Sequence, residues 1–544
     1  MATLTLLPEE LLELVVTYLD GRAVAALGST CSLLHQITSR ARVWDTLRRR
    51  SNLATSTRAM ERMVEGEDDL RARNMYFLSH KLRENWGSGR VKEMVLSSEE
   101  GSSVQLSSAR DLQASTTCLA MVSAPPLPSK ANPRARAGRS TLRIALLATG
   151  VTKELPFDCL AFQEHFVLDD FIVLLGKFGS EDRLPRPGDV MADVMVVSIK
   201  SSEVLMVKEE VFNVRDFMRA LWKDTAVFKN TIASFRQKTI TLHEVSEGDV
   251  VTRVLDVGDV VGNGVLQYSK FMAWDNQHLA HPFQAMPSNM LDDIRVEHII
   301  FCWNQTDWQR KVFKMPLCRM NDIQQSVAVS QGRLLAVQST VLRIWDIDTE
   351  QLVKTSHLEL PIPVLSSFPN SFHLTEGIGV HLEPELGLVL GLVTGHLGNR
   401  ATYTIVIFNL DWQLVASMTI PEEKDLQMLQ VFLTGPRLVV LYNDNSYSVV
   451  DLETLDREHH GIHWDGRTPL RVFPFPLGSA YKEGTQVSER SIQYAHLIEG
   501  VSGNTIYTNN HFDKVSEFNI VISHTKIDLE KGEKTRLVQA FSFI

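Results

Sequence analysis

The sequence predicts a two-part protein, in which a small all-α module at the N-terminus is joined by a helical linker to a large all-β domain. Three observations predict this arrangement. Apolar residues at helical spacing fill the first fifty positions, a broken amphipathic stretch follows at 58–86, and short alternating strands separated by turn residues occupy the chain beyond Trp86. We place the boundaries at 1–50 for the helical module, 51–89 for the linker and 90–544 for the β domain.

The helical module is predicted to contain three short helices. Pro8 lies at the first turn of the first helix, where acidic Glu9 and Glu10 meet the positive helix end. Apolar residues then follow at helical spacing, and Asp20-Gly21 ends the helix. A second helix is predicted over about 22–28, and a third begins at a Ser29/Thr30 cap. Leu33, Leu34 and Ile37 form the apolar face of the third helix, and Val43, Trp44 and Leu47 close the module.

This module carries more apolar surface than so small a unit can bury alone, which favours docking on a partner. Over roughly residues 4–50 it resembles the F-box family in the order and spacing of four segments, Leu-Pro-Glu-Glu-Leu-Leu, Tyr-Leu-Asp, Cys-Ser-Leu-Leu-His and Trp-Asp-Thr-Leu. The alternative is a helical cap packed on its own domain. The resemblance implies binding to the Skp adaptor subunit of SCF-type ubiquitin ligases, through docking residues that we expect to be buried in the complex: Leu7, Pro8, Leu11, Leu12, Val15, Leu19, Leu34 and Trp44.

One segment departs from the family pattern. Gly28-Ser29-Thr30 precedes Cys31, where the family more often carries a bulkier apolar residue. We expect this departure to loosen the packing of the third helix without removing the docking face.

The linker ends at Asn85-Trp86, followed by a glycine C-cap signal at Gly87 and Gly89. In F-box proteins that carry a WD-repeat propeller, the helical linker often finishes with a similar Asn-Trp. The resemblance therefore implies a hinge between linker and β domain at this dipeptide. The alternative is a buried tryptophan of the kind found at any helix end.

The β domain shows a weak internal repeat. The segment 341–353 matches the end of a WD repeat, with a strand, Trp-Asp, a turn and an outer strand. Similar segments occur at 404–415, 448–455 and 298–309, although the Gly-His half of the WD signature is absent at the expected offsets. By this resemblance we expect a degenerate WD-like β-propeller of about seven or eight blades.

Two further segments are predicted from composition and strand pattern. Residues 123–140 are rich in Pro, Ala and Ser and contain four basic residues without an acid, which indicates a disordered insertion between two strands. The apolar, strand-like stretch 535–544 is expected to pair with the first strands of the β domain, because closing a ring of sheets removes exposed edges.

Chemistry-bearing motifs are scarce. Two histidines four apart, His459 and His463, resemble a zinc-ligand pair, but Gly461 and the surrounding strands argue against the required helix. No phosphate-binding glycine loop, Gly-x-Ser-x-Gly segment or cysteine–histidine pair is found. We expect no catalytic residue, no cofactor and no metal site.

Composition limits the classes of partner. The net charge of −10 argues against nucleic acid or an anionic membrane surface as the main partner, and no apolar run reaches the length of a membrane span. The five cysteines include no Cys-x-x-Cys pair, which favours a reducing compartment, cytoplasmic and/or nuclear, and no cysteine-type zinc site.

The F-box resemblance implies a non-catalytic function. We expect the chain to be the substrate-recognition subunit of an SCF-type ubiquitin ligase, linked through the Skp adaptor to cullin and RING subunits, with the β domain binding target proteins for ubiquitination. A non-degradative F-box scaffold, acting in assembly or trafficking without a cullin, is the alternative. A propeller hydrolase is a third reading, which the missing nucleophile disfavours.

Overall fold

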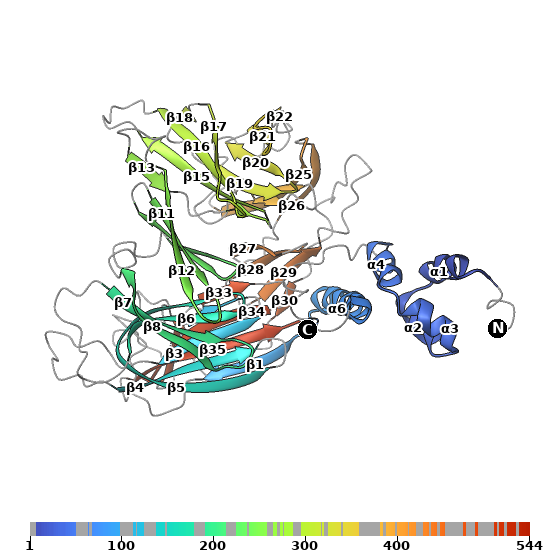
Figure 1. Cartoon of the computed structure of the whole chain (residues 1–544), viewed down its shortest axis with the longest axis horizontal. Helices are drawn as coiled ribbons and strands as arrows, with labels where there is room; N and C mark the ends of the chain where they lie inside the picture. Colours follow the sequence, from blue (N-terminus) through green and yellow to red (C-terminus); the bar gives the residue numbers. More distant parts are fainter. Residues whose placement is uncertain are drawn as a thin grey trace.

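The structure is a computed structural model of the 544-residue chain. It describes residues 7–50, Val64 and residues 68–97, and from there to residue 543 the strands given below with part of the turns between them. The helices are α1 (Glu9–Thr17), α2 (Gly21–Gly28), α3 (Ser32–Thr38), α4 (Ala41–Arg50) and α6 (Asp68–Ser88). In Figure 1 the helices α1–α4 lie to one side of the sheets, and α6 lies between them and the C-terminal end of the chain.

The N-terminal module has one helix more than the three predicted, because the closing Trp44 segment is itself the helix α4. Two helix ends also differ from the prediction. Asp20 does not end α1 but caps α2, since its Oδ1 accepts a hydrogen bond from the amide of Ala23 at 2.8 Å. Ser29 and Thr30 do not cap α3: both hydroxyls donate back to carbonyls at the end of α2.

The core of the module is completed by the linker helix. Buried residues of α1–α4 pack with Tyr76 of α6, and the set comprises Leu12, Val16, Val24, Ile37, Val43, Trp44, Leu47 and Tyr76. Gly21 and Gly28 allow the close approaches in this core: an added Cβ would lie 2.2 Å from the Tyr76 ring at Gly21 and 2.3 Å from Thr38 Oγ1 at Gly28. The expectation that Gly28 loosens α3 is therefore wrong, because the missing side chain lets Thr38 pack against α2.

The remainder of the chain is all-β, and its described strands form seven sheets. The first sheet joins both ends of the β region: β1 (Lys92–Ser97), β31 (Thr485–Val487), β32 (Thr505–Thr508), β33 (His511–Val515), β34 (Asn519–Asp528) and β35 (Glu533–Ser542). The second contains β2 (Leu112–Ala114), β3 (Cys118–Ser123), β4 (Gly138–Leu146), β5 (Val151–Val167), β6 (Phe171–Phe178), β7 (Met191–Ser198) and β8 (Val204–Asn213).

The other five sheets follow in chain order. The third is β9 (Thr225–Phe228), β10 (Thr231–Arg236), β11 (Thr239–Val245) and β12 (Val250–Asp256). The fourth is β13 (Val265–Tyr268), β14 (Ala273–Trp274), β15 (His278–Met286), β16 (Arg295–Asn304), β17 (Arg310–Lys314) and β18 (Cys318–Arg319). The fifth is β19 (Gln325–Ser330), β20 (Arg333–Gln338), β21 (Val341–Asp346) and β22 (Leu352–His357). The sixth is β23 (His381–Glu383), β24 (Leu388–Leu397), β25 (Arg400–Asn409) and β26 (Leu414–Thr419), and the seventh is β27 (Met428–Thr434), β28 (Arg437–Tyr442), β29 (Ser446–Asp451) and β30 (Val472–Pro474).

The long strand β5 serves two sets of partners. Its first half pairs with β4 and its second half with β6, and the register shifts between Cys159 and Ala161 and again between Phe162 and Glu164. Extra residues of this kind bend a strand. Each half of the second sheet is therefore a four-stranded antiparallel meander, β2–β5 and β5–β8.

The four predicted repeat segments occupy equivalent places. Residues 341–353, 404–415, 448–455 and 298–309 each contain all or part of the third strand of a meander (β21, β25, β29 or β16) and the start of the connection to the fourth. In two of these strands the register shifts at the same point, at Ile344/Trp345 and Ile407/Phe408. The sequence repeat is thus a structural repeat.

The expected pairing of 535–544 with the first strand of the β region is confirmed. β35 pairs with β1 in antiparallel register, with Ser542 opposite Lys92 and Leu537 opposite Ser97. The predicted insertion 123–140 is narrower than expected at both ends, because Ser123 ends β3 and Gly138 begins β4. Residues 124–137 lie outside the described residues. Among the described helices, none is long and apolar enough to cross a membrane.

Gly21→Ala tests the contact between α2 and α6. We expect it to destabilise the helical module by about 1–3 kcal/mol, because the methyl group requires the buried Tyr76 ring to move. Thermal unfolding followed by helical circular dichroism measures the change. Gly87→Ala is the matched control, since an added Cβ there meets nothing within 4 Å. Equal melting of both variants would contradict the contact.

Buried histidines make the β region sensitive to acid. Burial lowers the pKa of His165 to about 4 and that of His243 to about 4. The unfolded chain binds these protons at about pH 6.5, so it holds more protons than the folded chain between the two values. Stability should therefore fall as the pH drops from about 6.5 to about 4. We expect His165→Gln to reduce the slope of melting temperature against pH.

Candidate adaptor-binding surface

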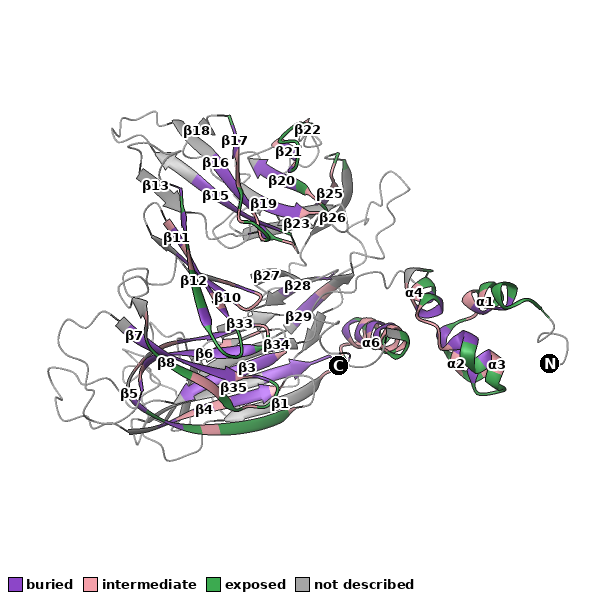
Figure 2. Ribbon diagram, viewed as in Figure 1, coloured by how far each residue is buried: buried purple, intermediate pink, exposed green. Residues whose placement is uncertain are grey.

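The exposed apolar residues of α1 lie on one face of the helix. Leu11, Leu14, Val15 and Tyr18 are 47%, 53%, 40% and 68% exposed. Their spacing of three, four and seven residues places them in a single stripe. We call these four residues the α1 stripe; α1 is drawn in Figure 2 with its exposed residues in green. An apolar stripe of this size on a helical module is typical of a protein-binding surface.

The eight residues predicted to dock fall into three groups. Leu7, Pro8, Leu11 and Val15 are exposed, so a partner can reach them directly. Leu12, Leu34 and Trp44 are buried within the chain itself, and Leu19 is half-buried against the same core. Those four shape the module from inside, and partner binding by the exposed group stays a prediction.

Sequence reasoning missed Leu14 and Tyr18. Leu14 lies three residues after Leu11, and Tyr18 lies three after Val15. Both could have been found by separating the two apolar faces of α1. One face carries Leu12 and Val16 into the core, and the other carries the α1 stripe outward. A helix packed on its own domain needs only one apolar face, so the second apolar face of α1 is available to a partner.

Ion pairs hold α1 against the rest of the module. Arg40, between α3 and α4, contacts Glu9 at 2.6 Å and Glu13 at 3.1 Å. The hydrogen bonds that Arg40 donates to these two carboxylates raise the pKa of Arg40. Arg42 also approaches Glu13, at 3.6 Å. These contacts use the acidic side of α1 and leave the α1 stripe uncovered.

The first half of α6 is fixed to α4. The Asp69 carboxylate accepts a hydrogen bond from the amide of Ala41 at 2.6 Å, which satisfies a donor at the start of α4. The Trp44 ring lies 5.5 Å from Tyr76 and 5.4 Å from Phe77, and its Nε1 donates to the Thr38 carbonyl at 2.7 Å. The helical module therefore includes this part of the linker.

The last turn of α6 is fixed to the β region. The indole of Trp86, 1% exposed, stacks on Phe543 with ring centroids 3.5 Å apart and planes 10° apart. Tyr447 meets both rings edge-on, and Asn85 Nδ2 donates to the Phe543 carbonyl at 2.8 Å. The expected hinge at Asn85-Trp86 is thus a packed joint with the end of β35 and with β29.

The turns between third and fourth strands repeat one geometry. Ser198, Asn304 and Asp346 each donate their amide to a carbonyl five residues later, at 3.0 Å in all three turns. The residue four positions on has a positive φ each time: 60° at Ser202, 58° at Trp308 and 57° at Glu350. The Asp346 carboxylate accepts hydrogen bonds from Thr349, which lower the pKa of Asp346.

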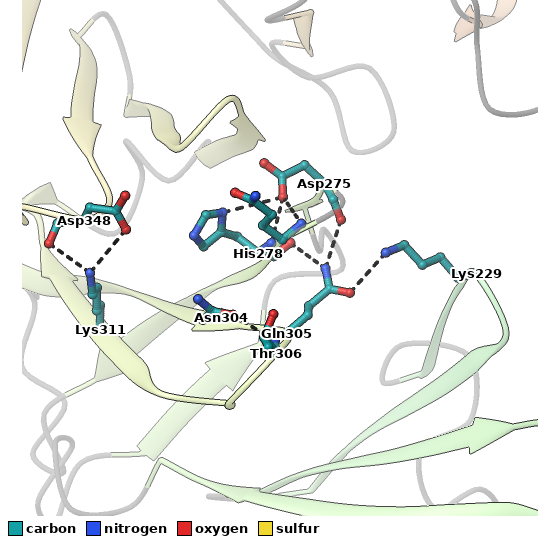
Figure 3. A network of polar contacts seen from close by, with 9 residues as sticks. Lys229, Asp275, His278, Asn304, Gln305, Thr306, Lys311 and Asp348 are labelled. Carbon is teal, nitrogen blue, oxygen red and sulfur yellow. Dashed lines mark hydrogen bonds and ion pairs between the residues drawn. The ribbon is translucent and has the colours of Figure 1, made fainter.

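Five cations on the outer strand of one meander each contact the connection between the third and fourth strands of the next meander. Figure 3 shows one of these contacts, in which Lys311 donates to the Ile347 and Asp348 carbonyls at 2.8 and 3.0 Å. The figure also shows Lys229, which follows β9 and bonds Gln305 at 3.1 Å.

We call these five outer-strand residues the clasp cations: Lys153, Lys208, Arg253, Lys311 and Lys354. Lys153 donates to the Ser201 carbonyl, and Lys311 donates to the Ile347 and Asp348 carbonyls. Lys208 pairs with Asp249, Lys354 pairs with Asp411, and Arg253 lies over the Trp308 ring. They join six consecutive meanders in chain order.

No group of three or more possible metal ligands occurs among the described residues. His459 and His463 lie outside them. Burial raises the pKa of the Cys118 and Cys302 thiols to about 12, so both are protonated at neutral pH.

Comparison with known proteins identifies the helical module. A family model described as F-box-like matches residues 4–50. No curated protein matches the chain. The chain thus has an F-box-like domain of short helices followed by a large all-β region of antiparallel sheets, and such a domain suggests an adaptor role in SCF-type complexes.

Several solved structures are similar to the chain at low identity. The crystal structure of BamB from Moraxella catarrhalis has 10% identity and a TM-score of 0.34, over 83% of this chain and 98% of that one. Hsv2 of Kluyveromyces lactis has 11% identity and a TM-score of 0.30, over 61% and 89%. A eukaryotic initiation factor has 10% identity and a TM-score of 0.34, over 80% and 90%. Similarity at this level assigns neither the fold nor the function.

Trp86→Ala tests the joint. Removing a fully buried indole should cost about 3–5 kcal/mol. Because the indole packs on β35, we expect the loss in the β region, measured by chemical denaturation followed by strand circular dichroism. Trp274→Ala, at a tryptophan 41% exposed, is the control and should cost much less. If Trp86→Ala unfolds at the denaturant concentration of the parent, the stack does not support the β region.

Proposed function

We propose that the chain is the substrate-recognition subunit of an SCF-type ubiquitin ligase. The observation that carries the proposal is the α1 stripe, an exposed apolar face on the first helix of the F-box-like domain. Leu7, Pro8, Leu11, Leu14, Val15 and Tyr18 bind the Skp adaptor, which links the chain to cullin and RING subunits. The chain itself catalyses no step.

In this proposal the β region binds target proteins. Ubiquitin transfer then depends on proximity, because the receptor holds a target lysine at high effective concentration near the charged conjugating enzyme. The α6 helix supports this function, since it packs on Trp44 at one end and on Phe543 at the other. A target bound by the β region is thereby held in a set geometry relative to the adaptor.

We further propose that the β region is a degenerate WD-like propeller of eight blades. Two features support this count. Division of the second sheet at β5 gives eight sheet units in total, and the clasp cations connect six of them in strict order. The pairing of β1 with β35 joins the first meander to the last residues of the region, as closure requires. We place the protein in the cytoplasm or nucleus, where its buried thiols stay reduced.

The double substitution Leu11→Ala/Leu14→Ala tests adaptor binding. Each leucine contributes about 1.5–3 kcal/mol if the adaptor buries it fully, so the affinity of the full chain for the Skp adaptor should fall about a hundredfold or more. Isothermal titration calorimetry measures the affinity. The matched control is Leu352→Ala/Val353→Ala, an exposed apolar pair on β22.

The result also separates the two functions that the F-box resemblance implies. Retention of cullin by the parent in a pull-down, and its loss in the double variant, would support the ligase. Retention of the Skp adaptor without cullin would favour the non-degradative scaffold. Unchanged adaptor affinity of the double variant would overturn the proposal.

A further inference from the structure

The C-terminal end of α1 carries a fixed pair of side chains. Tyr18 is 68% exposed, the largest exposure among the exposed large apolar side chains of the described residues. The Arg50 guanidinium lies 5.1 Å from the centre of the Tyr18 ring, and its Nη1 donates to the Thr17 carbonyl at 2.9 Å. Arg50 thus stacks on the ring and satisfies a carbonyl at the end of α1, so both side chains are ordered before any partner arrives.

The two ends of the α1 stripe have different charged neighbours. In the first half of α1, Glu9 and Glu13 face Arg40 in ion pairs. At the last turn the cationic Arg50 lies beside Tyr18, whereas the neighbouring Arg48 is already paired with Asp45 at 3.3 Å. Arg50 is therefore a cation beside this end of the stripe, although the whole chain has a net charge of −10.

We propose that Tyr18 and Arg50 form the contact that sets the direction in which the adaptor docks on α1. This inference rests on the proposed function and specifies the adaptor's surface: an apolar recess for the Tyr18 ring, with a carboxylate beside it for Arg50. Leu11, Leu14 and Val15 are all aliphatic, so their contacts alone do not fix which way along α1 the adaptor binds. A cation at one end gives it one, because complementary charges fix the register of an interface.

The residue types suit these two tasks. Tyrosine and arginine are over-represented among the residues that dominate binding energies, since each offers a large rigid surface with a polar group. Arg50 is held against an aromatic ring, so little side-chain freedom remains to be lost on binding. A rim charge acts mainly on the association rate and on its salt dependence, whereas a buried ring acts on dissociation.

The test measures binding kinetics of the full chain with the purified Skp adaptor at low and at physiological salt. For Tyr18→Ala we expect affinity about tenfold weaker, through faster dissociation. For Arg50→Glu we expect association slowed on the order of tenfold at low salt, with a smaller effect at physiological salt. Arg50→Lys keeps the charge and should recover most of the association rate. Lys81→Glu, at an exposed position on α6, is the control for charge reversal and should bind like the parent.

Melting curves identify a variant that fails to fold, and Arg50→Gln then replaces Arg50→Glu. Parent-like association by Arg50→Glu and Arg50→Gln at both salt concentrations would overturn the inference, as would parent-like affinity of Tyr18→Ala. If Leu11→Ala/Leu14→Ala still loses binding in that case, the proposed function stands without the directing contact. If the parent itself does not bind the adaptor, the proposed function fails.

Discussion

The stack of Trp86 on Phe543 is the contact on which the arrangement of the two parts depends. The helix α6 is 21 residues long; its first half packs in the core of the F-box-like module and its last turn carries this stack. A helix of that length spans about 30 Å. Because Asn85 also bonds the Phe543 carbonyl, the helix end is held by a hydrogen bond as well as by packing. The helix α6 therefore connects the module that bears the α1 stripe to the first sheet of the β region.

Within the β region, order between meanders comes from polar contacts as well as from apolar packing. Three of the five clasp cations, Lys153, Arg253 and Lys311, reach turns that share one hydrogen bond and a positive φ. Contacts of this kind link each meander to its neighbour. The partner of a clasp cation can vary: Arg253 contacts the Trp308 ring, whereas the other clasp cations contact a carbonyl or a carboxylate. This tolerance explains why the repeats are weak in sequence although their turns share hydrogen bonds and positive φ angles.

Local patterns in the sequence predicted three of the four short helices, the contact at Asn85-Trp86 and four of the repeats, because each depends on residues close together in the chain. The cap at Asp20 was misjudged since one side chain can end a helix or begin the next. The turn at Ser198–Glu203 was missed because it lacks the aromatic residue followed by Asp or Asn that is found at Trp303-Asn304 and Trp345-Asp346. The clasp cations join residues tens of positions apart, and neither member of a pair is unusual by itself.

Gly21 has a consequence for how this molecule can change over time. The glycine leaves a space on α2 that Tyr76 of α6 fills, so residues on either side of the sequence boundary at 50 share one core. Suppose that recombination replaced residues 4–50 alone with the F-box of another protein. Any residue larger than glycine at position 21 would then clash with the Tyr76 ring. An exchange that keeps this core intact would therefore include α6 as well as residues 4–50.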